Sequence, residues 1–175
     1  MEQATTSARV VSVSRQADGV ALVRFNRPPA NSYDRGFIDD LNAAIDEIRF
    51  DASIGAAILT SDLPKFFSAG ADIGMFRSVT SKVRAMTILH MHEVLLKIEH
   101  TPKIFIAAIG GHCLGGGLEI ALAADFPIVN LTPPAGASAG EAPALSPIIS
   151  KTTCNAIIGR YIRNVTRKNL GKCSI

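Results

Sequence analysis

FFSAGADIGMF (66–76) and KIFIAAIGGHCLGGGLEIALAAD (103–125) are the two stretches that decide the fold of this 175-residue chain. Each places a run of glycine, alanine or serine between a strand-like apolar segment and a helix-like segment. Small residues let the main chain approach a neighbour or a ligand closely, and the first turn of a helix offers N–H groups that lack acceptors. The two stretches therefore predict two strand–loop–helix units whose loops pack tightly or bind a ligand.

The segments around these stretches continue the same alternation of strand and helix. Apolar strand patterns occur at 9–16, 20–25, 54–59, 103–109 and 126–131, and helix patterns occur at 35–50, 78–99 and 118–125. Ala17-Asp18-Gly19 is a turn signal that predicts a hairpin between the first two strands. For the long helix we expect the core side to carry Val79, Val83, Met86, Leu89 and Leu96. This order of elements predicts an α/β sheet covered by helices.

Composition and charge narrow the class of protein. The net charge is +3, and the basic residues near the C-terminus are interrupted by a single aromatic residue, Tyr161, so we favour a solvated basic face over a nucleic-acid surface. The three cysteines form no CxxC pair, which is typical of reduced thiols. No signal-peptide core and no apolar run of membrane-spanning length is visible, so we expect a soluble cytoplasmic protein without membrane contact.

The two small-residue loops, Ser68-Ala-Gly-Ala-Asp72 and Gly115-Gly-Gly117, allow a specific chemistry. Two N–H groups that converge on one point form an oxyanion hole, which stabilises negative charge on a carbonyl oxygen. Taken alone, each loop is better explained by tight packing of a strand on a helix. A dinucleotide site is excluded by spacing, because the sequence contains neither G-x-G-x-x-G nor GxxxxGK[ST].

Glu119 is a candidate for proton transfer because it follows the glycine run in a helix made otherwise of Leu, Ile and Ala. Apolar surroundings disfavour the charged form of a carboxylate, whereas a glutamate at a helix edge would reach solvent. His90 and His92 point in different directions on one helix and make a poor metal pair. We therefore predict no metal and no separate cofactor.

Taken together, FFSAGADIGMF and KIFIAAIGGHCLGGGLEIALAAD strongly resemble the two signature segments of the crotonase (enoyl-CoA hydratase/isomerase) superfamily. GVALVRFNRPPAN and AAILTSDLPKFFSAGAD fit the same pattern in the same order. The resemblance implies a spiral of ββα units, assembly into homotrimers or hexamers, and an acyl-CoA thioester as substrate, with coenzyme A as part of that substrate. Within the superfamily the chain is most similar to the 2-enoyl-CoA hydratases.

The resemblance also assigns roles to residues of this chain. It places the oxyanion-hole donors on the N–H groups of Ala71 and Gly116, and it matches Glu119 to the first catalytic glutamate of the hydratases. Glu141 lies near the spacing expected for the second glutamate, without the surrounding F-G-x-P-E motif. The residues implied to contact the substrate are Arg27, Ala30, Ala69, Ala71, Asp72, Ile73, Gly74 and Gly116.

The similarity runs from about residue 10 to about residue 130, and we interpret residues 1–130 as the crotonase-like core. Residues 131–175 form an atypical tail in which disorder is one alternative, and the C-terminal third of the family pattern is missing or altered. The favoured function is hydration of 2-enoyl-CoA thioesters. The alternatives are an enoyl-CoA isomerase or another crotonase lyase, and a catalytically inactive fragment that binds acyl-CoA or a partner.

Overall fold

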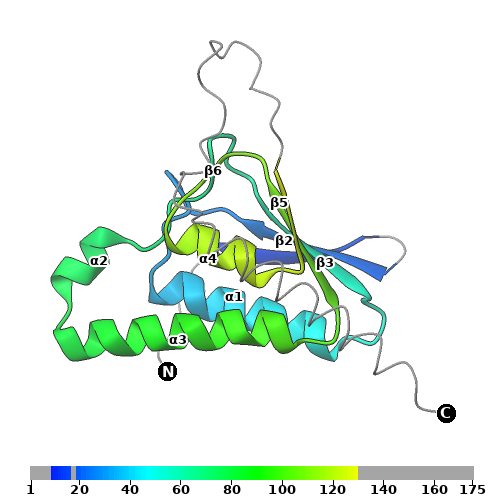
Figure 1. The fold of residues 1–175 in the computed structure, drawn as a ribbon, viewed down its shortest axis with the longest axis horizontal. Helices are drawn as coiled ribbons and strands as arrows, with labels where there is room; N and C mark the ends of the chain where they lie inside the picture. The colour runs from blue at the N-terminus through cyan, green and yellow to red at the C-terminus, as the bar shows by residue number, and fades with distance from the viewer. Residues whose placement is uncertain (1–8, 17–18, 130–175) are drawn as a thin grey trace, which may run out of the picture.

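The computed structural model describes residues 9–16 and 19–129, and these residues repeat a strand–strand–helix order three times (Figure 1). The first unit is β1 (Val11–Arg15), β2 (Val20–Phe25) and α1 (Arg35–Phe50). The second is β3 (Ala56–Ser61), β4 (Phe66–Ser68), α2 (Ile73–Ser78) and α3 (Ser81–His100). The third is β5 (Ile104–Ile109), β6 (His112–Cys113) and α4 (Gly116–Ala123), and β7 (Phe126–Val129) follows it. The predicted α/β class and ββα units are confirmed.

The first strand of each unit lies in one five-stranded sheet with the order β1-β2-β3-β5-β7. β1 pairs with β2 antiparallel, as the predicted hairpin requires, and the other pairs are parallel. β4 and β6 leave this sheet and form a parallel pair of their own. Each strand of that pair leads directly into one of the two small-residue loops, so the pairing brings the loops together.

The core lies between the sheet and α1. Burial alternates along the strands, because one face of the sheet packs on the helix while the other stays half-buried. Phe25 on β2 anchors this packing, with its ring centroid 5.2 Å from that of Phe37 and 5.3 Å from that of Phe67. Full burial of such a side chain contributes about 1.5–3 kcal/mol. On α1 the buried stripe is Phe37, Ile38, Leu41, Ala44, Ile45 and Ile48.

The predicted core side of α3 is wrong. Val83, Met86, Leu89 and Leu96 are between 48% and 57% exposed, whereas the buried residues are Thr87, Met91, Val94 and Ile98. Apolar residues occur on two faces of this helix, so its sequence does not select one. The buried face is set by contacts with α1, which runs beside α3 on the same side of the sheet, and with α4 (Figure 1).

Two further features of the described residues bear on the class of protein. None of their helices combines the length and the apolar character that a membrane crossing needs. Cys113 is a free thiol in the core, and burial raises its pKa to about 12, which makes it a poor nucleophile at neutral pH. Cys154 and Cys173 lie outside the described residues.

Candidate acyl-thioester site

The first small-residue loop connects β4 to α2 and is held by main-chain hydrogen bonds on both sides of Ala71. The N–H of Tyr33 donates to the carbonyl of Gly70 (2.8 Å), and the N–H of Asp72 donates to the carbonyl of Tyr33 (2.9 Å). Together they form a parallel bridge between Tyr33 and Ala71. In such a bridge the central residue's own N–H points away from its partner. The Ala71 N–H is therefore directed to the side opposite Tyr33.

The second loop connects β6 to α4 and turns at Gly115, whose φ of +50° is a conformation that L side chains rarely adopt. The turn makes Gly116 the first residue of α4, so its N–H has no acceptor within the helix. The N–H of Leu114 donates to the carbonyl of Ser68 (2.9 Å), which ties this loop to the first one. The second loop thus presents a helix N–H beside the segment that carries Ala71.

The two loops approach so closely that side chains at their glycines would collide. A Cβ added at Gly70, where φ is +88°, would lie 2.8 Å from the nitrogen of Gly116 and 2.9 Å from the carbonyl oxygen of Leu114. A Cβ at Gly117 would lie 2.4 Å from the carbonyl oxygen of Ser68. These contacts explain the small residues on both loops by packing, and the same packing places the Gly116 amide next to Gly70.

Within residues 9–16 and 19–129, neither of the two predicted donors, the Ala71 N–H and the Gly116 N–H, makes a hydrogen bond to another residue. Two adjacent N–H groups without acceptors suit a carbonyl oxygen that gains negative charge. That both of them bind one oxygen stays a prediction.

The surroundings of Glu119 differ from the prediction. Glu119 is exposed on α4, whereas Ile120, Ala121 and Ala123 of the same helix are buried. The sequence suggested an apolar environment because its neighbours in the chain are apolar, but those neighbours occupy the other faces of the helix. The charge of Glu119 nevertheless acts on Tyr33, whose pKa is raised first by burial and then by this carboxylate. Glu141 lies outside the described residues.

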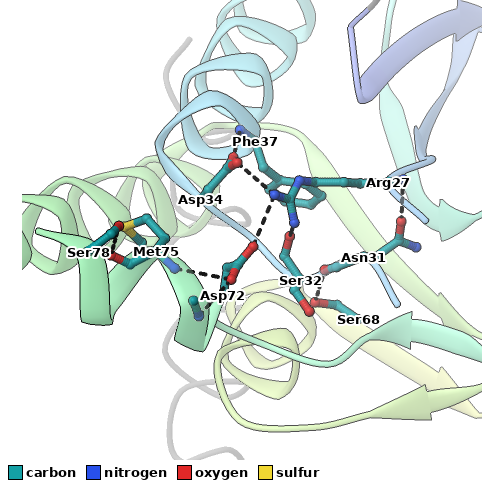
Figure 2. A network of polar contacts seen from close by, with 10 residues as sticks. Arg27, Asn31, Ser32, Asp34, Phe37, Ser68, Asp72, Met75 and Ser78 are labelled. Atoms are coloured by element: carbon teal, nitrogen blue, oxygen red, sulfur yellow. Dashed lines mark hydrogen bonds and ion pairs between the residues drawn. The ribbon is translucent and has the colours of Figure 1, made fainter. Parts of the chain in front are cut away.

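Arg27 connects the starts of two helices (Figure 2). Its guanidinium donates to the carboxylates of Asp34 (2.8 Å) and Asp72 (3.1 Å) and to the carbonyl of Ser32 (2.5 Å). Asp34 caps α1 through the Phe37 N–H, so the arginine and the cap are one network. Because it bridges these two carboxylates, Arg27 fixes the loop before α1 relative to Asp72, next to Ala71.

The remaining residues predicted to contact substrate lie on the same two segments. Asp72 caps α2 by accepting from the N–H groups of Gly74 (2.9 Å) and Met75 (3.2 Å). Ile73 is 68% exposed at the start of that helix. The N–H of Ala69 donates to the carbonyl of Ala30 (2.9 Å), so these two residues hold each other. All of them border the loop that carries Ala71, and their contact with coenzyme A stays a prediction.

The pKa of Asp72 is lowered from 3.8, first by the Met75 N–H and then by Arg27. A carboxyl whose pKa is lower in the folded state stabilises the fold above its unfolded pKa, and this contribution disappears as the pH falls through the folded pKa. In Asp72→Asn we therefore expect a lower free energy of unfolding at neutral pH, and the difference from the parent should shrink as the pH falls below 3.8 and vanish below the lowered pKa of the folded state. Urea unfolding between pH 7 and pH 2 measures this. In the control Asp62→Asn, at an exposed pair 3.6 Å from Arg24, the free energy should change by less than about 0.5 kcal/mol. A pH-independent difference for Asp72→Asn would contradict the account.

Asn31 is a central residue of the site region that the sequence did not single out. It is fully buried with φ of +50°, and its side-chain amide donates to Ser61 Oγ (2.7 Å) and the Phe67 carbonyl (3.0 Å). Its side-chain oxygen accepts from the Arg27 N–H (2.7 Å), and its carbonyl accepts from Ser68 Oγ (2.7 Å). Asparagine tolerates this backbone conformation better than most residues, and the turn-rich sequence around it was the available signal.

Asn31→Ala should therefore lower the free energy of unfolding by about 3–4 kcal/mol, because it strands several buried polar groups and strains the main chain. Urea denaturation at neutral pH measures the loss. Asn42→Ala is the matched control, since Asn42 accepts one hydrogen bond from Lys97 (2.6 Å) at the helix surface. The control should change the free energy by less than about 1 kcal/mol. Equal losses in the two variants would contradict the role given to Asn31.

Metal ligands are not grouped in the part of the chain that the structure describes. No cluster of three or more His, Cys, Asp or Glu side chains suited to a metal occurs there. His90 instead contacts Asp39 (3.0 Å) and Glu93 (3.6 Å) on the surface of α1 and α3. The predicted absence of a metal cofactor stays a prediction for the whole protein.

Comparison with known proteins identifies relatives of the whole core. The family model described as Enoyl-CoA hydratase/isomerase matches residues 15–162, which extends past the predicted end of the core at residue 130. The chain is 36% identical over 110 residues to a probable enoyl-CoA hydratase of Bacillus subtilis, covering 62% of this chain and 42% of the relative. It is 32% identical over 127 residues to the human mitochondrial enoyl-CoA delta isomerase 1, covering 73% of this chain and 42% of the relative.

Solved structures of an enoyl-CoA hydratase and of an enoyl-CoA isomerase also superpose on this chain. An enoyl-CoA hydratase structure from Geobacillus kaustophilus superposes with a TM-score of 0.68 and 44% identity, covering 71% of this chain and 47% of that one. The human mitochondrial Δ3-Δ2-enoyl-CoA isomerase gives a TM-score of 0.67 at 32% identity, with coverages of 71% and 48%. The chain thus spans about half the length of the relatives it matches.

Proposed function

Because this chain belongs to the enoyl-CoA hydratase/isomerase family, we propose that it binds acyl-CoA thioesters and hydrates 2-enoyl-CoA. The observation that supports the proposal is the close approach of Gly70, the residue before Ala71, to the nitrogen of Gly116. Neither the Ala71 N–H nor the Gly116 N–H has an acceptor among the described residues. Glu119 lies one turn along α4 from Gly116, on the exposed face of the helix. Donors for an oxyanion and a group for proton transfer are thus carried by adjacent segments.

In the proposed reaction the thioester carbonyl accepts hydrogen bonds from the Ala71 and Gly116 amides. Glu119 takes a proton from a water molecule while the water oxygen bonds to C3, and the C2–C3 π electrons move toward the carbonyl as an enolate. Net transfer of that proton from Glu119 to C2 then restores the thioester and the carboxylate, so one water is consumed and a 3-hydroxyacyl-CoA is formed. Glu141 is the residue that we propose as the second member of the pair. Removal of one donor from an oxyanion hole typically costs about 3–4 kcal/mol in the transition state.

Isomerisation of an enoyl-CoA is the second candidate reaction. It uses the same enolate but moves a proton between two carbons, and it needs no added water. The similarity to the human isomerase favours this alternative, because that relative matches over 73% of this chain. Glu119 favours hydration, since the resemblance assigns it to the hydratase pair. A protein that only binds acyl-CoA or a partner is the third candidate. We also propose that the protein is cytoplasmic and that it assembles into the homotrimer or hexamer typical of the family.

Two assays on the full chain distinguish these functions. Crotonyl-CoA hydration is followed by loss of the conjugated enoyl absorbance, and isomerisation of a 3-enoyl-CoA by its gain. Calorimetry with butyryl-CoA measures binding without reaction. Hydration supports the proposal, isomerisation alone supports the second candidate, and binding without turnover supports the third. A folded chain that neither binds nor reacts would contradict all thioester functions.

A further inference from the structure

Tyr33 contacts both halves of the candidate oxyanion hole, although nothing in the sequence pattern marked it. Its main chain brackets Ala71 through the hydrogen bonds to Gly70 and Asp72. These are the bonds that turn the Ala71 N–H to the opposite side of its segment. A displacement of the Tyr33 main chain would therefore also displace the Ala71 N–H.

The side chain of Tyr33 reaches the second amide. A Cβ added at Gly116 would lie 2.4 Å from both Cε1 and the hydroxyl oxygen of Tyr33, and 2.8 Å from Cζ. The aromatic ring therefore lies directly against the main chain of Gly116. On its other side the ring is supported by Phe37, whose centroid is 6.5 Å away. With only 7% of Tyr33 exposed, the ring has little freedom to move.

Within residues 9–16 and 19–129 the Tyr33 hydroxyl makes no hydrogen bond, whereas each fully buried side-chain polar atom there has a partner. A buried tyrosine normally directs its hydroxyl to a partner. Here the oxygen lies at Gly116, close enough to Glu119 for the carboxylate to raise its pKa. The phenol is thus protonated at neutral pH and can donate a hydrogen bond.

We propose that Tyr33 is a positioning residue of the acyl-thioester site. Its main chain holds the Ala71 amide and its ring holds the Gly116 amide. Its hydroxyl lies at Gly116, three residues before Glu119 on α4, and from there orients that carboxylate. The inference rests on the proposed function, which supplies the thioester that the amides and the carboxylate would act on. A residue that serves only to fill the core would need the ring but not the hydroxyl.

The first test examines the contact itself and does not depend on activity. The chain has two tyrosines, so Tyr161→Phe leaves Tyr33 as the single titrating phenol. Tyrosinate absorbance, with circular dichroism at each pH to verify folding, should give a pKa above 10.0 for Tyr33. Adding Glu119→Gln removes a negative charge that opposes the phenolate, so the pKa should fall while staying above 10.0 because burial remains. An unchanged pKa would overturn the electrostatic interaction between Tyr33 and Glu119, and with it the role of the hydroxyl.

The second test separates the hydroxyl from the ring. Tyr33→Phe should keep the melting temperature and the affinity for butyryl-CoA while lowering kcat for crotonyl-CoA hydration about tenfold, with KM within about threefold. Tyr33→Leu should lower kcat about a hundredfold, because displacement of the amides weakens transition-state binding. Tyr161→Phe, which removes the other phenol, is the matched control and should leave both constants unchanged.

The outcomes distinguish a failure of the positioning role of Tyr33 from a failure of the proposed thioester function. If Tyr33→Phe and Tyr33→Leu both match Tyr161→Phe in turnover, the positioning role is overturned while the thioester function stands. If the parent chain neither binds nor hydrates a thioester, the proposed function fails, and the titration of Tyr33 in the presence and absence of Glu119 still decides whether the contact exists.

Discussion

Gly70→Ala is expected to reduce turnover of a 2-enoyl-CoA by about 10²–10³-fold, the loss typical of an oxyanion-hole donor. The added methyl group would lie 2.8 Å from the nitrogen of Gly116 and 2.9 Å from the carbonyl of Leu114, and both are main-chain atoms that cannot turn aside. The φ of +88° adds backbone strain. The two loops must therefore separate, which moves the Ala71 and Gly116 amides apart.

The measurement is kcat/KM for crotonyl-CoA hydration together with the dissociation constant of butyryl-CoA, on protein shown to be folded by thermal melting. Gly110→Ala is the matched control, because a Cβ there would meet nothing within 4 Å and the backbone is not in a left-handed conformation. The control should keep its kcat/KM within about twofold. A Gly70→Ala variant as active as Gly110→Ala would show that the approach of the loops is a matter of packing alone.

Glu119→Gln is expected to lower kcat for hydration by about 10²–10⁴-fold, the range of general acid–base catalysis. Glutamine has nearly the same shape but cannot accept a proton from water. Because Glu119 is exposed on α4, the free energy of unfolding should change by less than about 0.5 kcal/mol. Affinity for butyryl-CoA should also be preserved, since the carbonyl is held by the main-chain amides.

Glu93→Gln is the control for this substitution, because Glu93 is another exposed glutamate, on α3 and 3.6 Å from His90. It should leave kcat, KM and binding unchanged. Retained hydration in Glu119→Gln would remove this residue from the mechanism and favour isomerisation or binding. An equal loss of binding and turnover would indicate a structural role for Glu119.

The sequence predicted best those elements whose residue types are compatible with only one local structure. Gly70 and Gly115 have positive φ values, and Gly117 faces Ser68 at a distance that excludes a side chain, so small residues marked both loops correctly. The apolar stripe of α1 has a single buried face, and its helix was predicted at the observed bounds of Arg35–Phe50. Here sequence pattern and tertiary packing agree.

The features that were missed depend on contacts between distant segments. Val83 and Met86 are exposed because α1 and α4 cover another apolar face of α3, which no local pattern reveals. Glu119 is exposed because its apolar neighbours face other directions around the helix. Asn31 and Tyr33 become informative only when the loop before α1 is placed against the glycine loops.

The central claim is that the amides of Ala71 and Gly116 bind one thioester oxygen. NMR of alanine- and glycine-labelled protein during titration with butyryl-CoA tests it directly, with the corresponding thioether, which lacks the carbonyl, as the reference ligand. Both amide proton signals are expected to move downfield with the thioester, and neither should do so with the thioether. Saturated binding of the thioester with only one of the two signals displaced, or with neither, would contradict it.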